Sequence, residues 1–210
     1  MPVTLGAQGE TPGPPTHLLY LHGFRSSPRS FKALRLRAWL QARHPAVHWW
    51  CPQLPASPRA ALTLLRAGVA SWPATGCAVL GSSLGGFYAT VLAEDSARGD
   101  WRVVLMNPAV DPARDLAAHV GELTAFHDPA QRFVFSTEHI EQLRALAVRG
   151  LTRPQRYLPI IAKGDELLSW REMSARYAGT PMRLIDGSDH GLSDFEDHLP
   201  HLLRFLKLCD

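Results

Sequence analysis

The sequence predicts an α/β fold in which a mostly parallel sheet is covered by helices on both faces. Two observations indicate it. Short apolar runs recur along the chain, at residues 17–21, 47–51, 77–80, 101–106, 157–162 and 182–185. Segments with the apolar spacing of a helix separate most of these runs. Strands that alternate with helices form parallel sheets, because each connection must cross one face of the sheet.

The first half of the chain holds three of the expected strands. After the run 17–21, apolar residues at 31, 34, 36, 39 and 40 predict a helix over 31–42. The run 47–51 ends as a strand at Pro52, and residues 59–71 form a second expected helix. The strand 77–80 leads into a tight glycine-rich turn at 81–86, which a helix of small side chains follows at 87–97.

The second half repeats the alternation around a longer insertion. The strand 101–106 stops at Asn107-Pro108. Residues 111–150 are expected to be mostly helical, most clearly at 137–148. A strand at 157–162, a helix at 171–177, a strand at 182–185 and a closing helix at 195–208 complete the expected order.

The chain of 210 residues is expected to form one domain. Residues 1–16 contain four prolines and three glycines without periodicity, which predicts a flexible N-terminal leader. Residues 17–210 carry no internal repeat, low-complexity tract or interdomain linker, so we expect a single α/β domain there.

Composition and charge exclude several classes of protein. The net charge is only +3, and 19 of the 22 cations are arginine, because lysine stands only at 32, 163 and 207. The densest basic run, residues 25–37, lacks the interleaved aromatic side chains that stack on bases, so we expect no nucleic-acid partner. No stretch approaches the roughly 18 apolar residues of a membrane span. Three cysteines without a CxxC pair, and no signal peptide, predict a cytoplasmic protein.

The turn at 81–85 (GSSLG) fits the G-x-S-x-G pattern of a nucleophile elbow, between an expected strand and an expected helix. Glycine is needed two residues before and after the nucleophile, because side chains there would collide in so sharp a turn. Ser83 has Gly81 and Gly85 at those positions, whereas Ser82 has leucines, so Ser83 is the candidate nucleophile. A phosphate-binding turn is the alternative, but no Walker lysine and no G-x-G-x-x-G spacing accompany it.

A serine hydroxyl needs a base that accepts its proton. His190 lies in the expected loop between the last strand and the closing helix, where chain order places the base of a Ser–acid–His set. His22 precedes the nucleophile, and His198 and His201 fall inside the closing helix. His190 is therefore the candidate base.

The acid that orients this histidine is expected just past a strand end. Asp165 lies three residues after the strand 157–162 and is the first choice. Asp111, after the strand 101–106, is the rival, and Glu166 is a weaker one. Asp189 is adjacent to His190, too near in the chain to reach Nδ1.

Two backbone N–H groups are expected to form an oxyanion hole for the tetrahedral intermediate. The first belongs to Leu84, the residue after the nucleophile. The second belongs to Phe24, in the loop after the first strand, where Gly23 permits a turn. His22 in this loop is expected to hold it by hydrogen bonds and not to transfer protons.

These segments resemble the YqiA-like esterases, a small family of α/β hydrolases. The resemblance rests on residues 20–28 (YLHGFRSSP), 81–90 (GSSLGGFYAT), 107–110 (NPAV), 164–168 (GDELL) and 187–190 (GSDH), in that order. It implies a compact α/β-hydrolase fold, a triad of Ser83, Asp165 and His190, and hydrolysis of carboxylic esters or thioesters without a cofactor. Arg25 stands where many relatives have a small polar residue. It either steers an anionic leaving group or is an ordinary surface arginine.

The spacing of the expected strands also predicts the size of the fold and of its lid. Few residues precede the first strand, so the two leading strands of a full-size α/β hydrolase are expected to be absent. About 50 residues, 107–156, separate the strands that bracket the lid, so we expect a small lid, an open site and modest substrates. Phe126 and residues 133–135 fall in this segment and line an acyl pocket or pack between helices.

The histidine pairs His44/His48 and His198/His201 have helix-like spacing but no obvious third ligand, so we expect no metal site.

Three functions are compatible with these residues. The first is a serine esterase for short to medium acyl esters. The second is a thioesterase for acyl-CoA or acyl-carrier substrates, suggested by Arg25, Arg29 and Lys32 near the site. The third, a non-catalytic binding protein with the same fold, conflicts with an intact set of Ser83, Asp165 and His190.

Overall fold

The structure is a computed structural model, and it describes residues 13–95, 100–128 and 130–209. Residues 1–12 of the expected leader and the last two residues of the expected helix 87–97 lie outside the described residues. Thr16, the last residue of that leader, already pairs with the body of the protein. Its N–H donates to the carbonyl of Gly76 over 2.8 Å, and its carbonyl accepts from the N–H of His48 over 2.8 Å.

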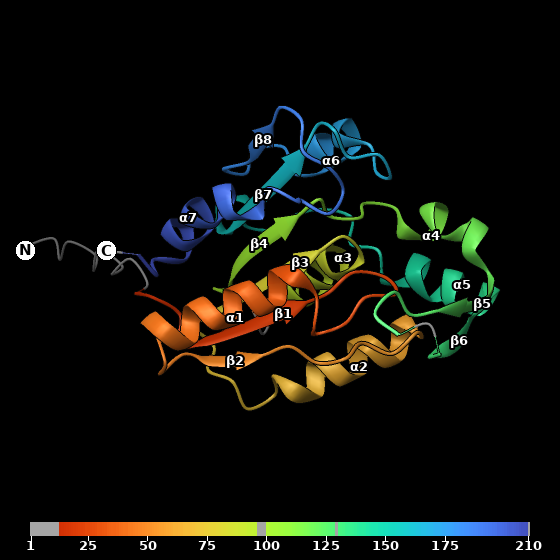
Figure 1. Cartoon of the computed structure of the whole chain (residues 1–210), viewed down its shortest axis with the longest axis horizontal. Coiled ribbons are helices and arrows are strands. Elements are labelled where there is room, and N and C mark those ends of the chain that lie inside the picture. The colour runs from red at the N-terminus through yellow and green to blue at the C-terminus, as the bar shows by residue number, and fades with distance from the viewer. Residues whose placement is uncertain (1–12, 96–99, 129, 210) are drawn as a thin grey trace, which may run out of the picture.

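A six-stranded sheet forms the centre of the described chain (Figure 1). Its order is β2-β1-β3-β4-β7-β8, and every neighbouring pair is parallel. The strands are β1 (His17–Leu21), β2 (His48–Trp50), β3 (Cys77–Ser82), β4 (Arg102–Met106), β7 (Tyr157–Ala162) and β8 (Arg183–Ile185). The expected parallel sheet is confirmed, with each strand within two residues of its expected bounds.

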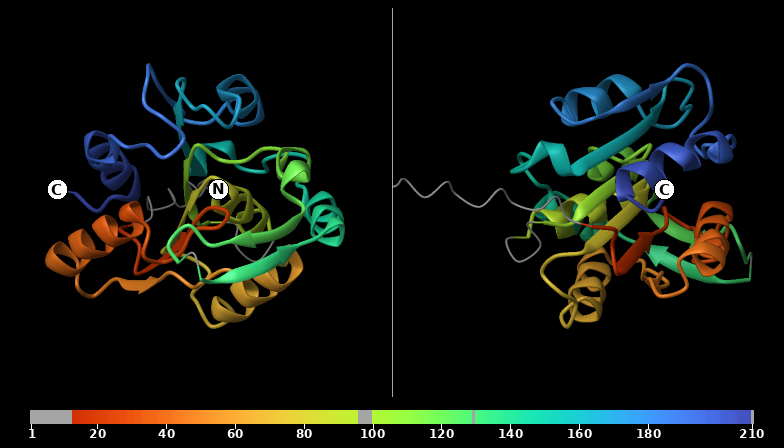
Figure 2. Two further views of the ribbon diagram at one scale, coloured as in Figure 1. Left: turned by 45° about the vertical axis from the view of Figure 1, so that its right-hand side comes forward. Right: turned by 90° about the vertical axis from the view of Figure 1, so that its left-hand side faces the viewer.

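Helices cover both faces of this sheet (Figure 2). Residues of α1 (Phe31–Arg43) and α7 (Phe195–Leu206) pack with one set of strand side chains, which includes Leu18 and Leu80. Residues of α2 (Pro58–Gly68) and α3 (Leu84–Ala93) pack with the alternate set, which includes Leu19 and Val79. Both faces are therefore buried, which explains why every residue of β3 and β7 is buried.

The segment between β4 and β7 differs from the expectation. It begins with α4 (Pro112–Asp115) and a 3-10 helix (Ala117–His119), and it ends with α5 (Thr137–Leu146) and a second 3-10 helix (Pro154–Arg156). Between them, β5 (Gly121–Thr124) and β6 (Arg132–Phe135) form an antiparallel hairpin. The prediction of mostly helical structure over 111–150 was wrong here.

The side chains of β6 explain the difference. Val134 is 63% exposed, whereas Phe135, its neighbour, is 1% exposed. This alternation is the period of a strand. Phe135 packs edge-on against Phe24 with ring centroids 5.0 Å apart, so a contact with the distant loop after β1 stabilises the hairpin.

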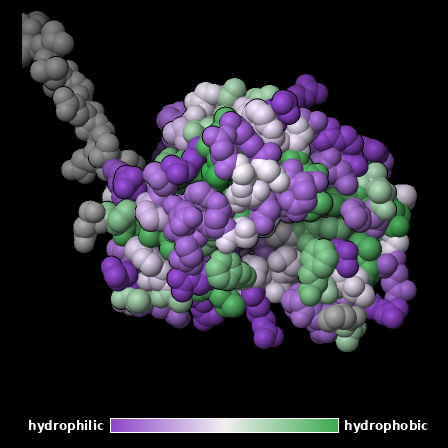
Figure 3. Space-filling model, turned by 45° about the horizontal axis from the view of Figure 1, so that its top comes forward, coloured by the Kyte–Doolittle hydropathy of each residue, from purple (hydrophilic) through white to green (hydrophobic). Residues whose placement is uncertain are grey.

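The remaining helix, α6 (Trp170–Arg176), follows β7. No helix in the described ranges is long and apolar enough to cross a membrane. Figure 3 shows that hydrophobic side chains lie in separate patches on a mostly hydrophilic face.

Candidate active site

Ser83 lies at the junction of β3 and α3, where it is the N-cap residue of the helix. Its backbone has φ +54° and ψ −122°, a conformation that residues other than glycine rarely adopt. Two hydrogen bonds fix it from outside the helix: its N–H donates to the Met106 carbonyl over 3.0 Å, and its carbonyl accepts from the Ala109 N–H over 3.0 Å. Such strain persists only where the surroundings enforce it. The helix begins at Leu84, three residues before its expected start, so strand and helix meet directly at Ser83.

The two glycines around Ser83 are required by close backbone contacts. A Cβ on Gly81 would lie 2.3 Å from the Gly85 carbonyl oxygen, and a Cβ on Gly85 would lie 2.1 Å from the Leu21 carbonyl oxygen. Neither space admits a side chain. The contact between positions 81 and 85 is the collision that the G-x-S-x-G pattern predicts, and Gly85 also allows the turn to pack against the end of β1.

The structure brings Ser83, His190 and Asp165 together in one hydrogen-bonded chain. His190 Nε2 lies 2.9 Å from Ser83 Oγ, and His190 Nδ1 lies 2.8 Å from Asp165 Oδ2. The Asp165 side chain is fully buried, and its other oxygen, Oδ1, accepts from the N–H groups of Leu167 and Leu168 over 2.9 and 2.8 Å. These bonds point Oδ2 at the imidazole ring.

The rival acids have other contacts. Asp111 Oδ1 accepts from the Arg114 N–H over 3.2 Å and caps α4. Glu166 Oε2 accepts from the backbone N–H of His190 over 2.9 Å, so Glu166 holds the backbone of the candidate base and not its ring.

His22 is buried beside the site, but both ring nitrogens are occupied. Nδ1 lies 3.0 Å from the Gly23 carbonyl oxygen and donates to it, while Nε2 accepts from the Leu54 N–H over 3.1 Å. Burial lowers the pKa of His22, so the neutral ring that these two bonds need is favoured. His22 thus joins the loop after β1 to the segment after β2.

The expected oxyanion donors lie beside Ser83. A Cβ on Gly23 would lie 3.3 Å from Ser83 Cβ, so the loop after β1 rests on the candidate nucleophile. Within the described part of the chain, the N–H groups of Phe24 and Leu84 donate to no acceptor. The Leu84 N–H also belongs to the first turn of α3, where unpaired N–H groups give the helix end partial positive charge.

Asn107 is a further site residue, and no role for it was predicted from the sequence. It is fully buried at the end of β4 with φ +41°. Its Oδ1 accepts from the Ala162 N–H over 2.8 Å, and its Nδ2 donates to the carbonyls of Asp189 and His190 over 2.9 and 3.1 Å. One side chain therefore joins the ends of β4 and β7 to the His190 loop. The available signal was an asparagine-proline pair directly after a buried strand.

Lys32 in α1 contacts the same loop. Its ammonium donates to the carbonyl oxygen of Gly191. Burial lowers the pKa of Lys32 to about 8, and the nearby Asp189 carboxylate opposes this shift.

A cavity of about 550 Å³ opens beside Ser83 and His190. Apolar side chains form much of its wall, among them Phe24, Leu116, Phe126, Leu167 and Leu168. We call it the His190 cavity.

Arg25 also lines this cavity, but its guanidinium is engaged elsewhere. Nε donates to the Thr124 carbonyl over 2.7 Å, and the group stacks 4.1 Å above the Phe126 ring. These contacts fasten the loop after β1 to the β5–β6 hairpin. A contact between Arg25 and substrate stays a prediction.

Within the described ranges, no cluster of three or more His, Cys, Asp or Glu side chains could hold a metal ion.

The central sheet, the elbow and its neighbouring histidine define the fold class of the α/β hydrolases, and solved structures agree. The chain superposes on a candidate hydrolase from Agrobacterium vitis S4 with a TM-score of 0.68 and 17% identity, covering 97% of each chain. A structure reported under the metagenome-derived lipolytic enzymes LipS and LipT superposes with a TM-score of 0.66 and 19% identity. The match covers 93% of this chain and 95% of that one. The mouse α/β hydrolase domain-containing protein 10 superposes with a TM-score of 0.64 and 14% identity, and the match covers 93% of this chain and 92% of that one. At these identities the likeness concerns the fold.

The family itself follows from the sequence. Residues 17–207 match the uncharacterised protein family UPF0227, and the chain belongs to that family. This is the YqiA-like family, so the expected resemblance is confirmed.

Proposed function

We propose that this protein is a serine esterase that hydrolyses carboxylic esters of short to medium acyl chains. The observation that carries the proposal is the hydrogen-bonded chain from Ser83 Oγ through His190 to Asp165 Oδ2, over 2.9 and 2.8 Å, at a strained elbow. The lipolytic enzyme among the structural neighbours supports the same chemistry by analogy of fold.

In the proposed reaction, Ser83 Oγ attacks the ester carbonyl while His190 Nε2 accepts its proton. Asp165 keeps the proton of the neutral ring on Nδ1 and stabilises the imidazolium that forms. The carbonyl oxygen becomes negatively charged and accepts hydrogen bonds from the N–H groups of Phe24 and Leu84. His190 then protonates the leaving oxygen, and an acyl-Ser83 ester remains. Water, activated by His190, releases the acid and restores the serine.

Hydrolysis of 4-nitrophenyl butyrate tests this proposal. Ser83→Ala should lower kcat/KM by at least about 10³-fold, because the nucleophile is lost while the fold is kept. Ser82→Ala is the matched control, since it removes the neighbouring hydroxyl and should keep activity within the same order of magnitude. Equal losses in both variants, or full activity in Ser83→Ala, would contradict the assignment.

A thioesterase is the second candidate, and the Lys32 ammonium in the wall of the His190 cavity favours it. Of the other two cations considered, Arg29 is exposed and Arg25 bonds to Thr124. Comparing kcat/KM for butyryl-CoA with that for an uncharged butyrate ester separates the two functions. If Arg25 binds the anionic leaving group, Arg25→Ala should lower kcat/KM for butyryl-CoA more than kcat/KM for the uncharged ester. A chain that turns over neither substrate and resists fluorophosphonate would be a binding protein.

A further inference from the structure

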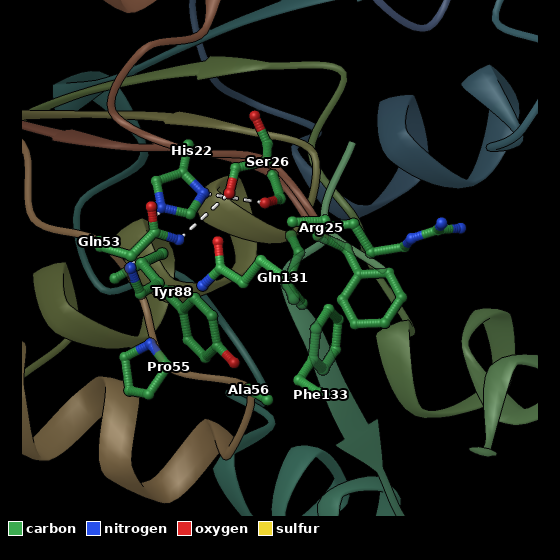
Figure 4. Close-up of a pocket in the computed structure, with 14 residues that line it drawn as sticks. His22, Arg25, Ser26, Gln53, Pro55, Ala56, Tyr88, Gln131 and Phe133 are labelled. Carbon is green, nitrogen blue, oxygen red and sulfur yellow. Dashed lines mark hydrogen bonds between the residues drawn. The ribbon is translucent and has the colours of Figure 1, made fainter. Parts of the chain in front are cut away.

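A second cavity, of about 290 Å³, also borders the loop after β1. Residues 22–26 form a wall of both cavities. Ser83 and His190 line only the first, whereas Leu84 and Tyr88 of α3 line only the second. Figure 4 shows the second one, which we call the Tyr88 cavity.

The chemistry of the elbow assigns the two cavities to the two halves of an ester. His190 must reach the leaving oxygen to protonate it, so the leaving group occupies the His190 cavity. The carbonyl oxygen is directed at the N–H groups of Phe24, which lines both cavities, and Leu84, which lines the second. The acyl group then extends past Leu84, toward the Tyr88 cavity. This volume is at the small end of the usual range for ligand sites, which suits a short acyl group.

The described wall of the Tyr88 cavity carries several polar side chains but no free charge. Tyr88 is 1% exposed and lines this cavity. Burial raises the pKa of Tyr88, so the hydroxyl keeps its proton and acts as a donor. In Figure 4 the amides of Gln53 and Gln131 lie around the same space as Tyr88. Among the described residues of the wall, Arg25 alone carries a charge, and it is bonded to Thr124.

Because Tyr88 lines this cavity, its hydroxyl can donate a hydrogen bond to an acceptor on a ligand bound there, and such a bond favours that ligand. The neighbouring amides add neutral donors and acceptors, whereas an anionic acyl group would meet no free cation among the described residues of this wall. We propose that the Tyr88 cavity binds the acyl group of the substrate and that Tyr88 selects acyl chains carrying a neutral oxygen, such as a keto or hydroxyl group. This inference rests on the esterase function proposed above.

Matched pairs of 4-nitrophenyl esters test it: 4-oxopentanoate against pentanoate, and 5-oxohexanoate against hexanoate. The wild type should prefer at least one oxo ester, and Tyr88→Phe should reduce that preference by about 10-fold, as expected for one neutral hydrogen bond. Comparing the ratio between variants cancels the intrinsic reactivity of each ester. Tyr177→Phe is the control, because that hydroxyl bonds to Thr90 Oγ1 over 2.9 Å and lines neither cavity. In Tyr177→Phe the ratio of kcat/KM for the oxo ester to that for its parent ester should equal the wild-type ratio.

A second variant keeps the test decisive if Tyr88→Phe does not fold. Ala56 lines the Tyr88 cavity alone, and Ala56→Leu fills it, so the ratio of kcat/KM for hexanoate to that for acetate should fall. An unchanged oxo preference in folded Tyr88→Phe, or an unchanged chain-length ratio in Ala56→Leu, would overturn the inference while the esterase function stood. No Ser83-dependent hydrolysis of any ester would overturn both.

Discussion

The side-chain amide of Asn107 donates to the carbonyl oxygen of His190 over 3.1 Å, although 83 residues separate them in the sequence. The contact is possible because the carboxyl ends of β4 and β7 lie at the same edge of a parallel sheet as the loop after β8. The described hydrogen bonds of the Asn107 side chain go to backbone groups and not to the imidazole ring. Asn107 fixes the backbone from which the ring extends, and so we regard it as a positioning residue.

Asn107→Asp should therefore impair catalysis through geometry. The aspartate side chain of this variant keeps an acceptor for the Ala162 N–H. It replaces the amide donor with an oxygen that faces the carbonyls of Asp189 and His190. A displaced His190 should lower kcat by roughly 10²-fold with a smaller change in KM. Gln142→Glu is the control, a buried amide-to-acid change beside Ser57 and Glu138 that should reduce stability but not kcat. A normal kcat in Asn107→Asp contradicts the positioning role.

The elbow glycines give a prediction about stability. Gly85→Ala forces a Cβ to within 2.1 Å of the Leu21 carbonyl oxygen, which is a backbone atom and cannot rotate away as a side chain would. We expect the free energy of unfolding to fall by roughly 3 kcal/mol or more. Gly150→Ala adds the same methyl group where no other atom lies within 4 Å and should be close to neutral. Urea denaturation of both variants measures the difference, and equal stabilities would show that the turn is not packed as described.

Lys32 predicts a pH dependence of stability. Its pKa falls from the ordinary 10.5 to about 8 on folding, because burial disfavours the charge. Between these values the unfolded chain binds a proton that the native protein does not, so stability rises with pH from about 8 to 10.5. Below pH 8 both states are protonated and the gain is absent. The unfolding free energy of the wild type minus that of Lys32→Met should increase across this window. A flat difference would exclude the lowered pKa.

Arg25 gives a prediction about the hairpin. Its bond to Thr124 and its stacking on Phe126 join the loop that carries the Phe24 N–H to β5. Arg25→Ala should accelerate amide hydrogen exchange over residues 121–135. Arg25→Lys keeps the charge but loses the planar group, so it should behave like the alanine variant. Protection restored by lysine would mean that charge alone, and not this geometry, is what matters.

The sequence was sufficient for those features that local rules determine. The glycines at 81 and 85 selected Ser83 over Ser82, and chain order together with loop position selected His190. Asp165 was the first choice of acid with Asp111 as its rival, and the structure brings Asp165 within hydrogen-bonding distance of His190. The hairpin was missed because its strands have four residues each and its stabilising partner, Phe24, lies about a hundred residues away. The contacts of Asn107 and Arg25 were not predicted either, and the reason is the same. Their partners lie between 55 and 99 residues distant, and no local pattern reveals such pairs.

The central claim is that Ser83 is a nucleophile activated by His190. Fluorophosphonate labelling, followed by peptide mass spectrometry, measures this directly, because the reagent forms a covalent adduct with an activated serine. We expect one adduct, on Ser83, and a labelling rate that falls by several orders of magnitude in His190→Ala. An unlabelled Ser83, an adduct on another residue, or an unchanged rate in His190→Ala would contradict the claim.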